Sequence, residues 1–213
     1  MNTSLRVPLN ASPEQSQRLQ ALQALFAQAC NALSPVVQQS RIWNRVALHH
    51  LMYRTLRARF PDLGSQMVCN AIYSVSRTSR LVFQHPDSPL NLTKLGDKPL
   101  PLLRFTDQCP VYFDRHTLSV KDGQLSMYTL DGRMRFALAL SPQDEANFKV
   151  YKLLEIVLSG SDASNYCLAF QFSDASVSAA PVLEDAPPEA TGEPAPPSAG
   201  AALPDYVLVE ETP

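Results

Sequence analysis

The run LSVKDGQLSMYTLDGRMRFALAL, residues 118–140, holds the clearest structural signal in this sequence. Two turn pairs, Asp122-Gly123 and Asp131-Gly132, separate short segments in which apolar and polar residues alternate. Asp-Gly between two alternating segments is a strong short-range signal for a hairpin turn. The run therefore predicts three antiparallel strands in a meander.

Other strands are expected on both sides of this meander. Apolar and polar residues alternate over residues 5–9 and over residues 166–172, which predicts a half-buried strand in each segment. Residues 151–157 are apolar and fit either a strand or a short helix. The first predicted strand is thus far in sequence from the others.

A helix is predicted to start after the first strand. Ser12 fits its N-cap, Pro13 its first position and Gln15 the reciprocal position of a capping box. Apolar residues at three- and four-residue spacing continue the helix over residues 19–33, and Ser34-Pro35 predicts its end and the start of another.

Two more helical stretches are predicted, one over about residues 44–60 and one from Ser65 onward, separated by a break at residues 61–64. The order strand, helices, strands predicts an α+β fold. We expect four parts: a first strand in residues 1–10, a helical bundle in 11–85, the remaining β domain in 86–173, and a disordered tail in 174–213.

The predicted tail is rich in proline and acid. It holds eight of the 18 prolines, eight acidic residues and no Lys or Arg, so it cannot bury enough apolar surface to offset chain entropy. Its end differs, because a short apolar run is flanked there by acids. This run is a candidate partner-binding strand or groove peptide, or else a terminus without a role: Tyr206, Val207, Leu208 and Val209. An acidic tail could also fold back over a basic groove and compete with nucleic acid.

The net charge of −2 conceals a strong asymmetry along the chain. Residues 1–83 hold nine Lys or Arg and two Asp or Glu, a net +7; residues 84–173 sum to −1 and residues 174–213 to −8. Clustered arginine is typical of phosphate-binding surfaces, although a solvated helix face looks the same. Nucleic-acid binding is therefore the positive functional signal.

The candidate phosphate contacts are arginines at helical spacing: Arg41, Arg45, Arg54, Arg57, Arg77 and Arg80. Trp43 lies between polar residues and is the candidate for stacking on bases, whereas core packing is favoured for Phe60 and Tyr73. A helix-turn-helix around residues 61–64 is a variant of this hypothesis, and an ordinary turn between helices is favoured over it.

Other classes of protein lack support. No apolar run is long enough to span a membrane, and MNTSLRVPLN lacks the pattern of a secretory leader. The four cysteines never form CxxC, the histidines lack ligand spacing, and neither a phosphate loop nor a nucleophile motif occurs. We therefore expect a bacterial cytoplasmic protein, with nucleoid association as a variant, that is not an enzyme and uses no metal, cofactor or small-molecule substrate.

Several segments resemble one family in order and spacing. The first strand followed by SPEQ and Ala29-Cys30-Asn31, then LHHLMYRTLRARFPDLGSQMVCNAI at residues 48–72, then VYFDRHTLSVKDGQLSMYTLDGRMRF at residues 111–136, resemble the front part of TnpB proteins. These are the OrfB products of insertion sequences and are related to type V CRISPR effectors. The resemblance covers about residues 4–173.

The resemblance implies a wedge domain, an antiparallel β-barrel-like unit whose first strand is split off by an inserted recognition bundle of helices. In that family the two parts hold a guide RNA and its hybrid with target DNA. The RuvC-like nuclease half that follows in the family has no counterpart here, because residues after 172 run into the Pro-rich tail. No catalytic residue is therefore transferred.

Three functions remain open from the sequence. The first is a non-catalytic module that holds a guide-like RNA or an RNA–DNA hybrid, either alone or as the front half of a split effector with a separate nuclease subunit. The second is a protein-interaction or regulatory module with an acidic, nucleic-acid-mimicking tail. The third is a decayed remnant of a transposon.

Overall fold

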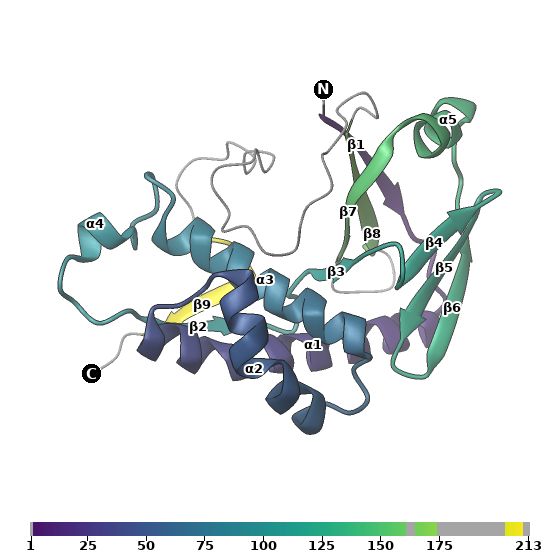
Figure 1. Cartoon of the computed structure of the whole chain (residues 1–213). Helices are drawn as coiled ribbons and strands as arrows, with labels where there is room; N and C mark the ends of the chain where they lie inside the picture. Colours follow the sequence, from purple (N-terminus) through teal and green to yellow (C-terminus); the bar gives the residue numbers. More distant parts are fainter. Residues whose placement is uncertain (1, 161–164, 174–202, 211–213) are drawn as a thin grey trace.

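The structure is a computed structural model that describes residues 2–160, 165–173 and 203–210 (Figure 1). Its elements, in chain order, are β1 (Asn2–Pro8), α1 (Pro13–Ser40), α2 (Arg45–Arg59), α3 (Ser65–Phe83), α4 (Leu92–Leu95), β2 (Leu102–Phe105), β3 (Val111–Phe113), β4 (Leu118–Lys121), β5 (Gln124–Thr129), β6 (Gly132–Ala137), α5 (Pro142–Val150), β7 (Lys152–Ser159), β8 (Cys167–Ser173) and β9 (Val207–Glu210).

Helix α1 begins as the sequence predicted. The Ser12 hydroxyl accepts the backbone N–H of Gln15, and the Gln15 side chain accepts the backbone N–H of Ser12. The predicted end at Pro35 is wrong, because α1 continues through it as one helix of 28 residues. Proline removes a single helical hydrogen bond, and the buried Leu33 and Val37 keep the helix packed on the core on both sides of Pro35.

The strands form three sheets in which every described pairing is antiparallel. The largest has the order β1-β8-β7-β3, so the first strand pairs with a strand more than 150 residues later in the chain. The predicted meander is confirmed as β4-β5-β6, with Gly123 at positive φ in its first turn. The second turn is formed by Leu130 and Asp131, one residue earlier than predicted, and Gly132, also at positive φ, begins β6. The structure is thus a mixed α/β fold with antiparallel sheets.

None of the three sheets closes into a barrel within the described residues, which corrects the barrel-like expectation. The ladder of the large sheet stops after β3, where the Asp114 carboxylate accepts the backbone N–H groups of His116 and Thr117. These hydrogen bonds stabilise a turn after β3, and the next strand, β4, belongs to the separate β4-β5-β6 sheet.

Residues 203–210 correct the expectation of a tail disordered throughout 174–213. Strand β9 pairs with β2 in antiparallel register, with Val207 opposite Phe105 and Leu208 opposite Arg104. Val207 is buried, and Arg104 forms an ion pair with Glu210. The short apolar run therefore completes a two-stranded sheet of its own chain, while residues 174–202 and 211–213 lie outside the described residues.

Helix α1 is joined to β2 by a side chain that acts like a neighbouring strand. The Asn31 amide accepts the backbone N–H of Phe105 at 2.7 Å and donates to the carbonyl of Phe105 at 2.9 Å. Two turns later along this face, Gln38 donates to the carbonyl of Leu100 at 3.0 Å. The sheet of β2 and β9 is thereby fixed to the helical half of the molecule.

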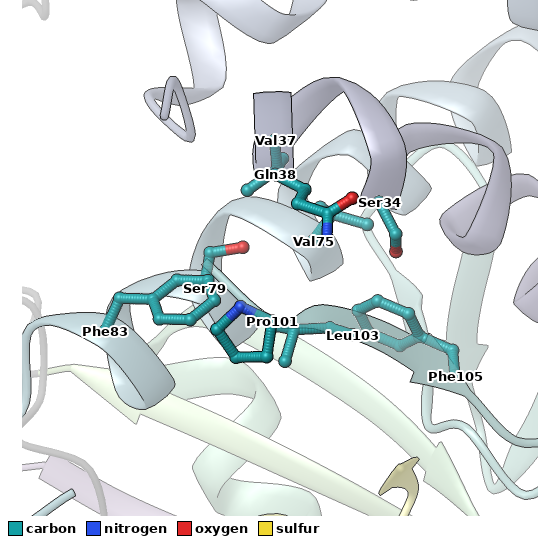
Figure 2. Close-up of a pocket in the computed structure, with 9 residues that line it drawn as sticks. All are labelled: Ser34, Val37, Gln38, Val75, Ser79, Phe83, Pro101, Leu103 and Phe105. Carbon is teal, nitrogen blue, oxygen red and sulfur yellow. The ribbon is translucent and has the colours of Figure 1, made fainter. Parts of the chain in front are cut away.

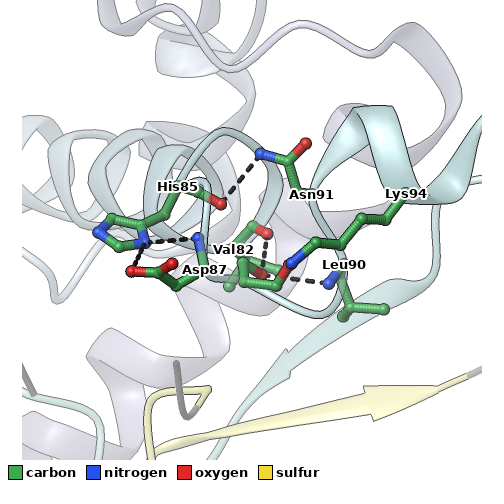
Figure 3. A network of polar contacts seen from close by, with 7 residues as sticks. Val82, His85, Asp87, Leu90, Asn91 and Lys94 are labelled. Atoms are coloured by element: carbon green, nitrogen blue, oxygen red, sulfur yellow. Dashed lines mark hydrogen bonds and ion pairs between the residues drawn. The ribbon is translucent and has the colours of Figure 1, made fainter. Parts of the chain in front are cut away.

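The segment after α3 is held by a local polar network (Figure 3). Asn91 donates to the carbonyl of His85 at 2.9 Å, and Lys94 donates to the carbonyl of Ser88 at 2.9 Å. The ammonium group of Lys94 is thus bound within the loop itself.

Among the described helices, none combines the length and the apolar character needed to cross a membrane.

Candidate nucleic-acid interface

Helix α2 supplies a cationic surface on the helical half. Its 15 residues, RVALHHLMYRTLRAR, include four arginines and two histidines but no carboxylate. Asn44 caps its first turn, and the buried Leu48 and Leu56 hold one side in the core. The opposite side, with His50 and Arg54, therefore faces solvent.

Arg54 is the most available of the predicted contacts. Its side chain is exposed and has no hydrogen bond or ion pair with another residue of the described ranges 2–160, 165–173 and 203–210. Arg59, at the end of the same helix, is also exposed, and its guanidinium lies 5.5 Å from the ring centroid of Phe60. Both guanidinium groups can reach a ligand without breaking an ion pair.

Two other predicted arginines converge on one cluster between α2, α3 and β7. The Arg45 guanidinium lies 5.3 Å from the ring centroid of Tyr73, whose hydroxyl donates to Glu155 at 2.8 Å. Arg77 is 3.6 Å from the same carboxylate and 6.0 Å from the ring centroid of Tyr112. Glu155 therefore neutralises part of this charge, and the exposed Arg45 forms the outer edge of the cluster.

Burial controls the protonation of the inner groups of this cluster. Desolvation lowers the pKa of Arg77, but the nearby Tyr112 and Glu155 outweigh it and leave that pKa above its ordinary value. Desolvation also raises the pKa of Tyr112 well above its ordinary value, so its phenol stays protonated at neutral pH. The inner cluster thus includes the Arg77 cation, the Glu155 carboxylate and the protonated phenol of Tyr112.

The remaining predicted arginines bind within the chain. Arg41 donates to the carbonyl of Lys98 at 3.0 Å, and Arg57 donates to the carbonyl of Leu63. Arg80 is half-buried and donates to a serine one turn earlier in α3 at 3.3 Å. Arg41 remains exposed, but Arg57 holds the turn between α2 and α3 and is less available to a ligand.

Trp43 is not a stacking platform, which corrects the prediction made from its polar neighbours. Its side chain is only 8% exposed, and its ring centroid lies 5.6 Å from that of Phe83. Trp43 points inward because the chain turns between α1 and α2, and the preceding Ile42 is left exposed instead. The sequence did not predict that Trp43, between polar residues, is buried while the apolar Ile42 is exposed.

The run predicted to bind a partner, residues 206–209, instead packs against the rest of its own chain. The ring of Tyr206 stacks near that of Phe105, with centroids 6.5 Å apart, and its hydroxyl lies 3.4 Å from the Thr78 hydroxyl. Val209 is half-buried, whereas Leu208 is 55% exposed. A partner that docks on β9 as it stands would therefore meet Leu208 rather than the whole run.

The helix-turn-helix variant does not fit the position of α3. That helix packs on α1, α2 and β3 and buries 12 of its 19 residues. A recognition helix needs a free face to enter the major groove. Only a half-exposed stripe of α3 remains, along residues 66–80.

Sequence reasoning missed the carboxylate of the Arg77 cluster and a second cationic surface. Glu155 lies 78 residues after Arg77, and no local pattern links the two. The second surface, on the outward face of β4, β5 and β6, includes Tyr128, Arg133 and Arg135. The alternation over residues 124–137, already used to predict strands, also places these three side chains on one face.

A metal or small-molecule site is not apparent in the parts of the chain that the structure describes. No group of three or more His, Cys, Asp or Glu is placed to hold a metal ion there. His49 stacks on Tyr53, with ring centroids 4.6 Å apart. A hollow between α1, α3 and β2, with Ser79 and Phe83 on its wall, is too small to admit water (Figure 2).

Comparisons with known proteins leave the family open. No model of a known protein family matches the chain, and no curated protein is significantly similar to it.

Proposed function

We propose that this chain is a non-catalytic nucleic-acid-binding module. It would hold a structured, guide-like RNA or an RNA–DNA hybrid through contacts to the phosphate backbone. The observation that supports this proposal most is α2, a helix with four arginines and no carboxylate. Its outward side includes Arg54, which has no hydrogen-bond or ion-pair partner among the described residues. Exposed arginine can bind phosphate bidentately, and such contacts read shape rather than sequence.

The resemblance to TnpB proteins gives this proposal its ligand class. In that family a wedge domain and a recognition bundle hold the guide and its hybrid. The split first strand and three packed helices are compatible with such a wedge and bundle. Under this proposal the chain acts alone as an RNA-guided binder, or it is the front half of an effector whose nuclease is another chain.

The test is a charge reversal on α2. We expect the double variant Arg54→Glu/Arg59→Glu to bind a hybrid of about 20 base pairs at least 10-fold more weakly than the original chain. The slope of log K against log salt should become shallower by about 2, one for each lost phosphate contact. Arg57 is left unchanged, because it holds the Leu63 carbonyl and its loss would disturb the turn.

A matched control reverses two exposed charges elsewhere. Lys149→Glu/Lys152→Glu changes the net charge equally, near the end of α5 and at the first residue of β7. Helix α5 lies far from α2 (Figure 1). If both double variants weaken binding alike, the effect reflects net charge and the assignment to α2 is wrong. Unchanged binding by the α2 variant would also refute it.

A protein-interaction module remains the second candidate, because α2 also exposes apolar side chains. Val46 is 54% exposed, Leu51 is 53% exposed, and Ile42 before the helix is 37% exposed. Deleting residues 203–213 does not separate the two functions, since it removes β9 from the fold. Val46→Ser/Leu51→Ser on α2 and Leu208→Ser on β9 leave the backbone pairing intact. Loss of a partner protein in these variants, with nucleic-acid binding absent throughout, would favour this second function.

A further inference from the structure

The β4-β5-β6 sheet has one face in the core and the other in solvent. Leu125 and Met127 point inward from the central strand and are fully buried. The outward side chains are polar or small around one aromatic ring: Ser119, Lys121, Ser126, Tyr128, Arg133 and Arg135. The only aromatic ring among these outward side chains of the described strands is that of Tyr128, near the end of the central strand, and it offers an apolar plane to solvent.

The ring of Tyr128 is held in place in solvent. Tyr128 is 44% exposed and pairs across the strands with Arg133, whose guanidinium lies 4.2 Å from the ring centroid. Arg133 is itself oriented by bonds to the carbonyl and hydroxyl of Ser126 at 3.2 and 3.0 Å, and to the carbonyl of His116 at 3.4 Å. The stacked pair therefore loses little conformational entropy when a planar ligand binds.

Positive charge surrounds this stacked pair. Lys121, Arg133 and Arg135 share the face, and no carboxylate occurs among its outward side chains in the described strands. Asp122 lies in the turn at its edge, and Asp131 in the other turn is neutralised by Arg18 of α1 at 2.7 Å. The face thus attracts polyanions.

The chemistry of this face selects one kind of ligand. The core of a protein interface is more apolar than its rim and is depleted of charge. On this face the outward neighbours of Tyr128 are Ser126, Arg133 and Arg135, none of them a large apolar residue. The bases of a duplex are stacked on one another and cannot reach the ring, whereas unpaired bases can stack on aromatic and arginine planes. Three strands span about 10 Å, which leaves room for one or two bases.

We infer that the outward face of β4-β5-β6 binds unpaired bases of a single-stranded nucleic acid, with Tyr128 as the stacking surface. Arg133 orients the ring, and Arg135 and Lys121 contact the flanking phosphates. This inference rests on the proposed function and adds a second, separate contact surface that recognises bases. RNA and DNA share the stacking chemistry, so the experiment includes both.

The test compares strands with and without bases. The probes are fluorescein-labelled oligouridine, oligothymidine and an abasic strand, each of about 12 nucleotides, a length typical of single-strand sites. We expect the full chain to bind both base-containing strands about 10-fold more tightly than the abasic strand. Tyr128→Ala should abolish this difference and Tyr128→Trp should retain it, while Arg135→Ala should weaken binding of all three probes.

Controls separate this result from misfolding and from the proposed function. Arg6→Ala removes another exposed arginine, from β1, and should leave all affinities unchanged. Every variant should keep the melting temperature of the original chain, because Tyr128 and Arg135 are exposed. Equal binding of abasic and base-containing strands, or an unchanged preference in Tyr128→Ala, overturns the inference. Binding of the hybrid without binding of single strands overturns it and leaves the proposed function standing, and binding of neither refutes both.

Discussion

Replacing Asn31 with alanine removes the side chain that joins α1 to β2. The amide of Asn31 makes two hydrogen bonds to the backbone of Phe105, at 2.7 and 2.9 Å, on the edge of β2 that faces away from β9. Alanine at this position keeps the helix but leaves the Phe105 N–H and carbonyl without partners. We expect the free energy of unfolding to fall.

The size of this loss follows from the burial of Phe105. Two hydrogen bonds contribute about 2 kcal/mol together. Because Phe105 is only 2% exposed, water replaces them poorly, and the unpaired backbone groups raise the cost to about 4 kcal/mol. Alanine regains about 0.7 kcal/mol through its higher helix propensity. The net loss is therefore about 3 kcal/mol.

Urea denaturation followed by far-ultraviolet circular dichroism measures this loss. With an m value of about 2 kcal/mol/M, the transition midpoint should shift down by about 1.5 M at unchanged m. Gln28→Ala, an exposed position three residues earlier in α1, should leave the midpoint in place. A shift in Asn31→Ala no larger than that of the control would show that the amide does not anchor β2.

Two further changes test other parts of the fold. Gly160→Ala should cost about 3 kcal/mol, because its φ is +123° and an added Cβ would lie 2.5 Å from the carbonyl oxygen of Asn165; an unchanged urea midpoint would contradict this. Tyr206→Phe should reduce alkaline destabilisation. Burial raises the pKa of Tyr206 above its ordinary value, so its stabilising effect is present below about pH 10 and is lost as the pH rises further. Melting temperatures from pH 8 to 11 should fall less in the variant, and parallel curves would refute the assignment.

Local signals in the sequence predicted the elements well. The capping box at Ser12, the turn at Asp122-Gly123 and the helix after Asn44 all depend on contacts within a few residues, and the structure has each of them. The second turn of the meander lies one residue earlier than the predicted Asp131-Gly132 pair. The break expected at Pro35 failed because burial on both sides outweighed one lost hydrogen bond. Tertiary packing therefore determined that α1 continues through Pro35, and a local sequence pattern carries no information on such packing.

Long-range features were the part that the sequence could not supply. The pairing of β9 with β2 joins residues about 100 positions apart, and the composition of the intervening segment predicted disorder up to the terminus. The same holds for Trp43, because the polar residues beside it in the sequence do not indicate that it packs against the ring of Phe83, 40 residues away. Closure of the sheets was also beyond local patterns, because it depends on how β3 and β4 separate at Asp114.

The candidate interface shows why a count of arginines overstates a binding surface. The five N–H donors that suit a guanidinium to phosphate suit it equally to carbonyls and carboxylates of its own chain. Arg57 and Arg77 are used in this way, at the Leu63 carbonyl and at Glu155, so their charges also serve the fold. Arg54 lacks such a partner in the described residues, and its removal therefore changes ligand binding without removing an internal bond. A comparison of Arg54→Ala with Arg77→Ala isolates this difference, because only the second should lower the melting temperature.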